Sequence, residues 1–261
     1  MRTVKQLFDL SGKTALVTGG SRGLGLQIAG ALGEQGAELV LAARKEAELE
    51  EAVAALAARG IRASAVVADL SQEAAAAELA QQALRRLGHV DILVNNAGAT
   101  WGAPAAEYPL KAWDKVMDLN VRAAFLLAQA VGRDSMIPRR NGRINNLASI
   151  AGLAGSGPGT MQTIAYNTSK AALINFTRTL AGEWGHFGIT VNALAPGFFP
   201  SKMSAGLLAH MGADEVARRA PLQRLGDEED LKGAAVLFAS DAGKHITGQV
   251  LAVDGGVSAV L

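Results

Sequence analysis

The chain has 261 residues, of which 49% are apolar and 19% charged, and it contains no cysteine. A chain of this length can bury a large core without cross-links, and the lack of cysteine excludes disulfide scaffolds, thiolate metal sites and cysteine nucleophiles. The formal net charge of +1 argues against a dedicated nucleic-acid-binding protein. The N-terminal residues contain no apolar signal segment, and no stretch of uncharged residues is apolar enough to predict a membrane span. We therefore expect a cytoplasmic protein without a membrane partner.

Short apolar runs alternate with longer helical patterns along the whole chain. We expect strands at Thr14–Thr18, Glu38–Leu41, Ala63–Ala68, Asp91–Val94, Arg143–Leu147, Thr190–Leu194 and Gln249–Val253. We expect helices at Leu24–Gln35, Glu46–Arg59, Gln72–Leu87, Ala112–Arg133, Ala165–His186 and Glu228–Ser240. Because the strands are almost continuously apolar, helices should cover both faces of their sheet. The alternation predicts one α/β domain over residues 1–261, with a doubly wound, seven-stranded parallel sheet.

A glycine-rich turn follows the first predicted strand. It reads Thr18-Gly19-Gly20-Ser21-Arg22-Gly23-Leu24-Gly25 and leads into the first helix. Glycines allow a tight turn and a close approach to a pyrophosphate, whose charge is attracted by the N–H groups at the helix start. The turn therefore predicts dinucleotide binding through Gly19, Ser21, Arg22, Gly23, Leu24 and Gly25.

The end of the second strand indicates which dinucleotide is bound. An NAD-binding chain should carry an acidic residue there, which would bind the ribose 2′-hydroxyl. This sequence instead reads Leu41-Ala42-Ala43-Arg44-Lys45. Arg44 and Arg22 could together bind a 2′-phosphate, although both could also be solvated surface residues. The sequence thus favours NADP(H), with NAD(H) as the alternative.

Further motifs follow, namely Asn95-Asn96-Ala97-Gly98, Asn120, Ser149 and Tyr166-x-x-x-Lys170. Together with the glycine turn they resemble the short-chain dehydrogenase/reductase family over essentially the whole chain. The resemblance implies a Rossmann fold, a catalytic tetrad of Asn120, Ser149, Tyr166 and Lys170, and no metal. It also implies cofactor contacts from Asp69, Leu70, Asn96, Ala97, Gly98, Tyr166, Lys170, Pro196, Gly197, Phe199 and Ser201.

Tyr166 and Lys170 are four residues apart on a predicted helix, so they can approach the same ligand. An ammonium about 4 Å from a phenol favours the phenolate by roughly 4 kcal/mol, or about three pKa units, while burial opposes this shift. We therefore expect Tyr166 to exchange a proton with the substrate oxygen, to which Ser149 is hydrogen-bonded. The resemblance gives Asn120 the role of holding a water that links Lys170 to solvent.

The spacing from Ser149 to Tyr166 is 17 residues, a few more than is usual in the family. The extra residues fall in the turn-forming sequence Gly155-Ser156-Gly157-Pro158-Gly159-Thr160, which either shapes the substrate pocket or is a surface bulge. Ser156 is a rival for the serine role. Ser149 is preferred because it directly follows the fifth strand.

The segment Lys202–Arg219 occupies the position of the family's substrate-binding loop. We expect a lid over about residues 200–222, because apolar residues recur there at helical spacing. The expected substrate contacts are Ser149, Tyr166, Trp101, Phe198, Met203 and Leu207, with core packing as the alternative for the apolar ones. An apolar lid favours a hydrophobic or cyclic ketone or a 3-oxoacyl group. The runs Leu7–Lys13 and Phe198–Lys202 instead resemble those of sugar-acid (gluconate-type) dehydrogenases, so the substrate class stays open.

Two functions of different classes fit these observations. The first is an NADP(H)-dependent oxidoreductase that interconverts a small-molecule ketone and a secondary alcohol. The second is a catalytically inactive, cofactor-sensing or scaffold protein, which should lack part of the tetrad; the presence of all four residues favours the enzyme. The resemblance further implies a homotetramer built through the helices at Ala112–Arg133 and Ala165–His186 and the C-terminal segment.

Overall fold

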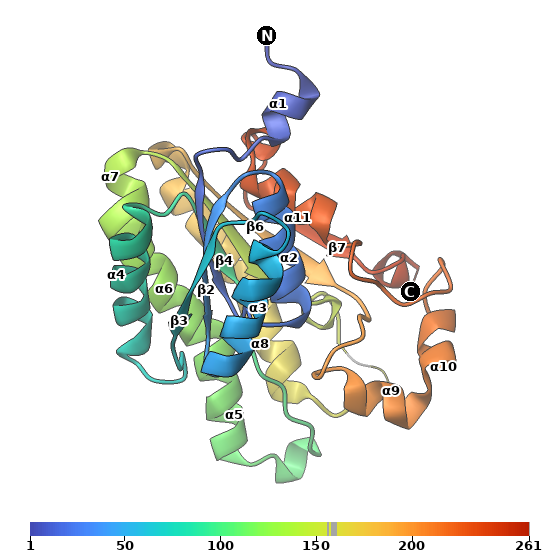
Figure 1. Cartoon of the computed structure of the whole chain (residues 1–261). Helices are drawn as coiled ribbons and strands as arrows, with labels where there is room; N and C mark the ends of the chain where they lie inside the picture. The colour runs from blue at the N-terminus through green and yellow to red at the C-terminus, as the bar shows by residue number, and fades with distance from the viewer. Residues whose placement is uncertain (156, 158–160, 261) are drawn as a thin grey trace.

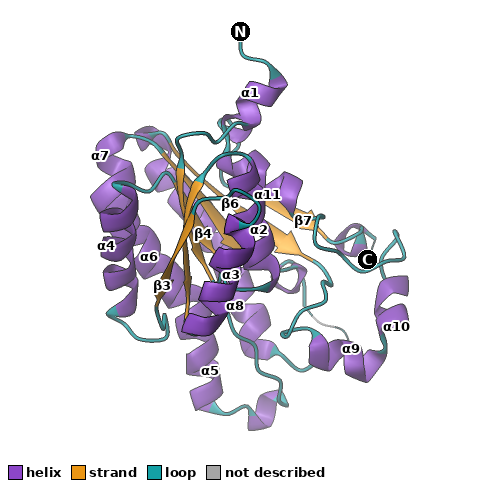
Figure 2. Ribbon diagram, in the orientation of Figure 1, coloured by secondary structure: helices purple, strands orange, loops and turns teal. Residues whose placement is uncertain are grey.

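The computed structural model describes residues 1–155, 157 and 161–260, except for the side chains of Leu207 and His210. Within these residues a seven-stranded parallel sheet has the strand order β3-β2-β1-β4-β5-β6-β7. Its strands are β1 (Thr14–Thr18), β2 (Glu38–Ala43), β3 (Ala63–Val67), β4 (Ile92–Asn95), β5 (Gly142–Leu147), β6 (Ile189–Pro196) and β7 (Val250–Val253). Figures 1 and 2 show helices on both faces of the sheet, which confirms the predicted single-domain α/β fold.

Two apolar cores lie on opposite faces of the sheet. One face packs against α2 (Gly23–Glu34), α3 (Glu46–Ala57) and α11 (Lys232–Ala239), and the other against α4 (Ala75–Leu87), α6 (Ala123–Val131) and α8 (Ile164–Trp184). Successive strand residues point to opposite faces. In β1, Ala15 and Val17 accordingly belong to the first core and Leu16 to the second. The continuous apolar runs in the sequence thus reflect burial on both faces.

The helix expected at Ala112–Arg133 is longer and less regular than predicted. The chain is helical from α5 (Leu110–Met117) through α6 to α7 (Ile137–Arg139), with π-helical turns at Asp118–Arg122 and Gly132–Met136. Such turns insert an extra residue into the helical repeat and are frequent at functional sites. The first of them carries Asn120. The spacing of apolar residues along the sequence does not predict these π-helical turns.

The segment that was predicted to form a lid contains two short helices rather than one. They are α9 (Ala205–Met211) and α10 (Ala213–Arg218), separated by Gly212, whose φ is +81°. Figure 1 shows both helices outside the layers that cover the sheet. The chain begins with a short helix, α1 (Val4–Phe8), which the sequence analysis did not predict. Among all the helices described, none is long and apolar enough to cross a membrane.

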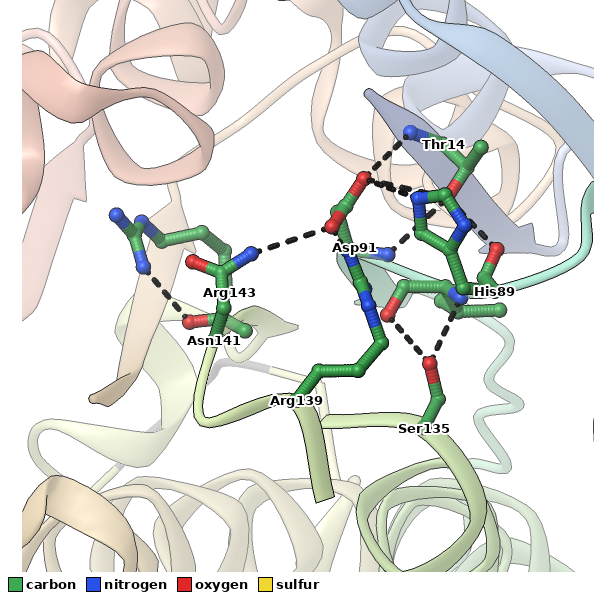
Figure 3. Close-up of polar contacts among 9 residues, drawn as sticks. Thr14, His89, Asp91, Ser135, Arg139, Asn141 and Arg143 are labelled. Carbon is green, nitrogen blue, oxygen red and sulfur yellow. Dashed lines mark hydrogen bonds and ion pairs between the residues drawn. The ribbon is translucent and has the colours of Figure 1, made fainter. Parts of the chain in front are cut away.

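A buried carboxylate joins the amino ends of the central strands (Figure 3). Asp91, just before β4, is 3% exposed and accepts hydrogen bonds from the Thr14 backbone N–H at 3.1 Å and from Arg139 Nη1 at 2.9 Å. It also contacts Asn141 Nδ2 at 3.2 Å and His89 Nε2 at 3.1 Å. Burial raises the pKa of this carboxyl, but the hydrogen bonds from Arg139 and Thr14 outweigh burial and hold it below the ordinary value. This cluster stabilises the amino-terminal ends of the central strands, at the end of the sheet opposite the candidate active site.

Candidate active site

The glycine-rich turn between β1 and α2 packs directly against Asn96, which follows β4. Asn96 Nδ2 donates to the carbonyl oxygens of Thr18 at 2.9 Å and Gly19 at 3.1 Å. A Cβ would lie 2.6 Å from this nitrogen if placed on Gly19 and 2.4 Å from it if placed on Gly25. Only glycine therefore fits at these two positions. Asn96 joins the turn to the neighbouring strand at the place where the strand order reverses, which is where open α/β sheets bind their ligands.

The start of α2 has the features of a phosphate-binding site. Its N-cap residue, Arg22, is extended and makes no side-chain capping hydrogen bond, so the N–H groups of the first turn are not capped. Gly23 has a φ of +54°, and no described atom lies within 4 Å of the place where its Cβ would stand. The pyrophosphate of a dinucleotide fits here because its charge is attracted to these donors.

Ser149, Tyr166 and Lys170 line one cavity of about 520 Å³. Ser149 follows β5 and caps a short helical turn, with its Oγ accepting the Ala151 N–H at 3.2 Å. Tyr166 and Lys170 lie on the first two turns of α8. The cavity therefore collects residues from the carboxyl end of a strand and from one face of a helix, as their spacing predicted. The cofactor candidates Leu24, Asn96, Gly98, Pro196, Gly197, Phe199 and Ser201 line the same cavity.

Lys170 is the most buried cation of this cavity, with 5% of its surface exposed. Its Nζ donates to the Leu147 carbonyl oxygen at 2.5 Å. Burial lowers the pKa of the amine to about 8. Among the described atoms this is the only hydrogen-bond acceptor of Lys170, although an ammonium can donate more bonds than one. The spare donors of this buried group fit the hydroxyls of a ribose.

The expected acidification of Tyr166 is wrong in direction. Burial raises the pKa of the phenol, and a hydrogen bond with Ser149 lowers it by less. The physical reason is the position of Lys170, whose Nζ lies 5.5 Å from the centre of the Tyr166 ring, over its face, and donates to a carbonyl. The two side chains share the cavity as expected, but Tyr166 keeps its proton at neutral pH.

Asn120 has fewer free groups than its expected water-holding role assumes. Its Oδ1 accepts the Ala99 N–H at 2.7 Å, and its Nδ2 donates to the Ala99 carbonyl at 3.0 Å and to Ser169 Oγ at 2.9 Å. Both amide protons are thus used, and only Oδ1 can accept another bond. A Cβ on Gly98 would lie 3.1 Å from this oxygen and 3.8 Å from Lys170 Nζ. Asn120 therefore braces the strand-to-helix connection close to Lys170.

Three of the remaining cofactor candidates, Asp69, Leu70 and Ala97, are absent from the cavity lining. Leu70 is 8% exposed and packs in the second core, and Asp69 Oδ1 accepts hydrogen bonds from the Ser71 N–H and hydroxyl. Ala97 donates its N–H to Thr18 Oγ1 at 3.0 Å, which supports the glycine turn. Ser201 lines the cavity, but its hydroxyl accepts the Ser204 N–H at 3.1 Å.

The substrate side of the cavity is largely apolar. Phe198 and Met203 line it as expected, together with Ile150, Leu153, Met161 and Met211. Trp101 does not line the cavity and is 48% exposed, whereas the preceding residue, Thr100, does line it. The side chain of Leu207 and all of Ser156 lie outside the described residues. The sequence did not single out Arg219, which joins Lys170 as the second cation among the described lining residues; of the adjacent pair Arg218-Arg219, nothing in the sequence indicates which side chain faces the cavity.

Comparisons with known proteins agree with this geometry. A short-chain dehydrogenase family model described as "Enoyl-(Acyl carrier protein) reductase" matches residues 19–258. The chain is 42% identical to a gluconate 5-dehydrogenase of Gluconobacter oxydans, over 98% of both chains. It is 41% identical to a rhamnolipids biosynthesis 3-oxoacyl-[acyl-carrier-protein] reductase of Pseudomonas aeruginosa, over 95% of this chain and 97% of that protein.

A solved gluconate 5-dehydrogenase of Burkholderia cenocepacia, in complex with NADP and tartrate, superimposes with a TM-score of 0.92 at 33% identity. The match covers 99% of this chain and all of that one. These matches extend over almost the whole chain and include the glycine turn and the cavity. The chain belongs to the short-chain dehydrogenase/reductase family of oxidoreductases.

Proposed function

We propose that this protein is an NADP(H)-dependent oxidoreductase that transfers a hydride between nicotinamide and a ketone or secondary alcohol. The observation that carries the proposal is the cavity shared by Ser149, Tyr166 and Lys170, which also contains the end of the glycine turn. The nicotinamide supplies or accepts the hydride when it is bound. The protein must bind the carbonyl oxygen and move a proton to it.

Tyr166 is the proton donor of the proposed reaction. Because burial raises the pKa of its phenol, the hydroxyl is protonated at neutral pH, which is the form needed to protonate an alkoxide. Ser149, hydrogen-bonded to Tyr166, would donate to the same substrate oxygen and stabilise its developing charge. Lys170 would hold the ribose hydroxyls, and its positive charge stabilises the tyrosinate left after proton transfer.

NADP(H) is favoured over NAD(H) by the charges at the end of β2. Arg44 is exposed and makes no ion pair with any residue that the structure describes. Arg22 lies in the glycine turn, where it can approach a 2′-phosphate. The Burkholderia relative, which has the same fold, is an NADP complex. Comparable kcat/KM values for NADPH and NADH would contradict this preference.

The apolar wall of the cavity favours a hydrophobic or cyclic ketone or a 3-oxoacyl group as substrate. A gluconate-type sugar acid is the second candidate, because Arg219 provides a cation that could bind a carboxylate. The relatives include a 3-oxoacyl-[acyl-carrier-protein] reductase and a gluconate 5-dehydrogenase. We assign residues 200–222 the role of a substrate-binding lid.

We also propose that the enzyme is a homotetramer that works in the cytoplasm. Phe125 on α6 is 45% exposed and packs edge-to-face against Phe176 of α8, with 6.3 Å between the ring centres. Exposed aromatic residues on these helices suit an interface between subunits. A monomeric mass in analytical ultracentrifugation would contradict the assembly.

The proposed reaction is tested by following NADPH absorbance with three carbonyl compounds and the same enzyme stock. The panel contains a 3-oxoacyl thioester, a cyclic ketone and 5-ketogluconate, each repeated with NADH. We expect turnover with NADPH in at least one case and a rate about a thousandfold lower with the Tyr166→Phe variant. Tight NADPH binding without turnover of any compound would instead favour a cofactor-sensing protein.

A further inference from the structure

Three cations converge on one carboxylate oxygen in the first turn of α3, which directly follows β2. Glu48 Oε1 lies 2.8 Å from Arg22 Nη1, 3.0 Å from Lys45 Nζ and 3.7 Å from Lys202 Nζ. Hydrogen bonding to Lys45 and the charges of Arg22 and Lys202 hold the pKa of this carboxyl below its ordinary value, so Glu48 is ionised at neutral pH. One negative charge therefore faces three positive charges.

The three cations come from segments far apart in the sequence. Arg22 belongs to the glycine turn, and Lys45 is the N-cap residue of α3. Lys202 lies between β6 and α9, in the segment assigned as the lid. Of these three residues, only Lys202 comes from the lid segment, and its contact with Glu48 brings that segment next to the start of α3. Its side chain is 72% exposed, so it is free to exchange one anionic partner for another.

We propose that Lys202 binds the 2′-phosphate of NADP(H) and thereby joins the lid to the cofactor. The inference rests on the proposed function, since it requires NADP(H) as the cofactor. A phosphate monoester carries about −1.5 to −2 charges at neutral pH and several acceptor oxygens. It can therefore contact Arg22 and Lys202 on different oxygens, whereas at Glu48 the ammonium of Lys202 shares Oε1 with Arg22 and Lys45. Glu48 keeps the cations together until the phosphate replaces it.

The proposed contact makes cofactor choice and lid position depend on each other. Met203, next to Lys202, and Met211, at the end of α9, line the substrate cavity. A phosphate that holds Lys202 therefore also holds one edge of the substrate pocket. NADH, which lacks this phosphate, would leave the lid attached through Glu48 alone. Substrate binding should thus be weaker in the NADH complex.

Glu48 could alternatively accept the ribose hydroxyls of NAD(H), as an acidic residue at this end of the cleft would. Glu48 Oε1 lies within 4 Å of three cations, so one negative charge already compensates part of their positive charge. A neutral ribose hydroxyl at Glu48 would leave the remaining two positive charges uncompensated. A phosphate monoester, which carries about −1.5 to −2 charges, compensates them. The charge balance therefore favours the phosphate.

The test measures binding of adenosine 2′,5′-bisphosphate and 5′-AMP by calorimetry, because neither nucleotide carries nicotinamide. The wild type should bind the bisphosphate more tightly than 5′-AMP. Lys202→Met should weaken bisphosphate binding about fivefold, the size of one exposed charge-assisted contact, and leave 5′-AMP binding unchanged. Lys202→Arg should restore the affinity. Lys115→Met, on the exposed face of α5, is the matched control and should bind as the wild type does.

Amide hydrogen exchange provides a second measurement that does not depend on turnover. The bisphosphate should slow exchange in α9 of the wild type but not of Lys202→Met, and 5′-AMP should slow it in neither. If the wild type and Lys202→Met bind the bisphosphate equally, the inference is wrong while the NADP(H) preference stands. If the wild type binds both nucleotides equally, the cofactor preference itself fails, and the inference fails with it.

Discussion

Replacement of Lys170 by methionine should change how the stability of the fold depends on pH. The amine is 5% exposed, and burial lowers its pKa from 10.5 to about 8. This difference between the unfolded and folded states corresponds to about 3 kcal/mol. The protein bears this cost when the buried ammonium is charged, because the charge loses its hydration on folding. Methionine has a similar length and cannot titrate.

The sign of the effect follows from proton binding. Below about pH 8 both states carry the proton, so the folded wild type bears the full cost. Between about pH 8 and 10.5 the folded state releases the proton first, so the unfolded state binds more protons and stability rises with pH. Relative to Lys170→Met, the wild type should therefore gain about 2 to 3 kcal/mol in unfolding free energy between about pH 7 and 10.

Urea unfolding at both pH values, followed by circular dichroism, measures this gain. The quantity of interest is the difference between wild type and variant, because other titrating groups contribute equally to both. Lys115→Met serves as the control, since an exposed lysine should give the same difference at both pH values. A difference between wild type and Lys170→Met that stays constant to within about 0.5 kcal/mol would refute the idea that burial depresses the pKa of this amine.

Three further substitutions test other parts of the structure. Gly25→Ala places a Cβ 2.3 Å from the Gly19 carbonyl oxygen. We therefore expect the free energy of unfolding, measured by thermal denaturation, to fall by about 1–3 kcal/mol, and NADPH binding, measured by fluorescence, to weaken. Gly182→Ala is the control and should show neither effect, because the space around Gly182 is open. Asp91→Asn should lower the unfolding free energy by about 3 kcal/mol at neutral pH. Because the pKa of Asp91 lies below 3.8, this gap should persist at pH values above that and close only as the pH falls through the folded-state value; a constant gap would contradict it. If a sugar acid is the substrate, Arg219→Gln should reduce kcat/KM for 5-ketogluconate about tenfold and leave kcat/KM for a cyclic ketone unchanged. An equal reduction for both compounds would exclude a carboxylate-binding role of Arg219.

The fold could be predicted because its signals are local. Thr14–Thr18 is buried on both faces, so its apolar run is unbroken and the predicted bounds match those of β1. The predicted bounds of the other strands lie within two residues of those observed. The expected helices begin and end within four residues of those observed, apart from the one around Asn120. There the π-helical turn at Asp118–Arg122 packs against α8, and Asn120 donates a hydrogen bond to Ser169 of that helix; the spacing of apolar residues does not reveal such tertiary contacts.

Three residues of the candidate site could be predicted to share one cavity, whereas the electrostatics of the site could not be predicted. The order of Ser149, Tyr166 and Lys170 along the chain was enough to place them in one cavity. The direction of the Tyr166 pKa shift could not be predicted from this order, because it depends on how deeply the ring is buried and where Lys170 Nζ points. The cluster of cations around Glu48 could not be predicted from the sequence either, because its residues come from three separate segments of the chain.

The proton-donor role of Tyr166 can be measured with Tyr166→Phe, which removes the hydroxyl and keeps the ring. Single-turnover absorbance gives the rate of NADPH oxidation with the best ketone of the panel, and fluorescence titration gives the Kd for NADPH. Loss of a general acid should lower the rate by about a thousandfold while the Kd changes by less than about twofold. A rate within about tenfold of the wild type, with NADPH binding intact, would show that another group donates the proton.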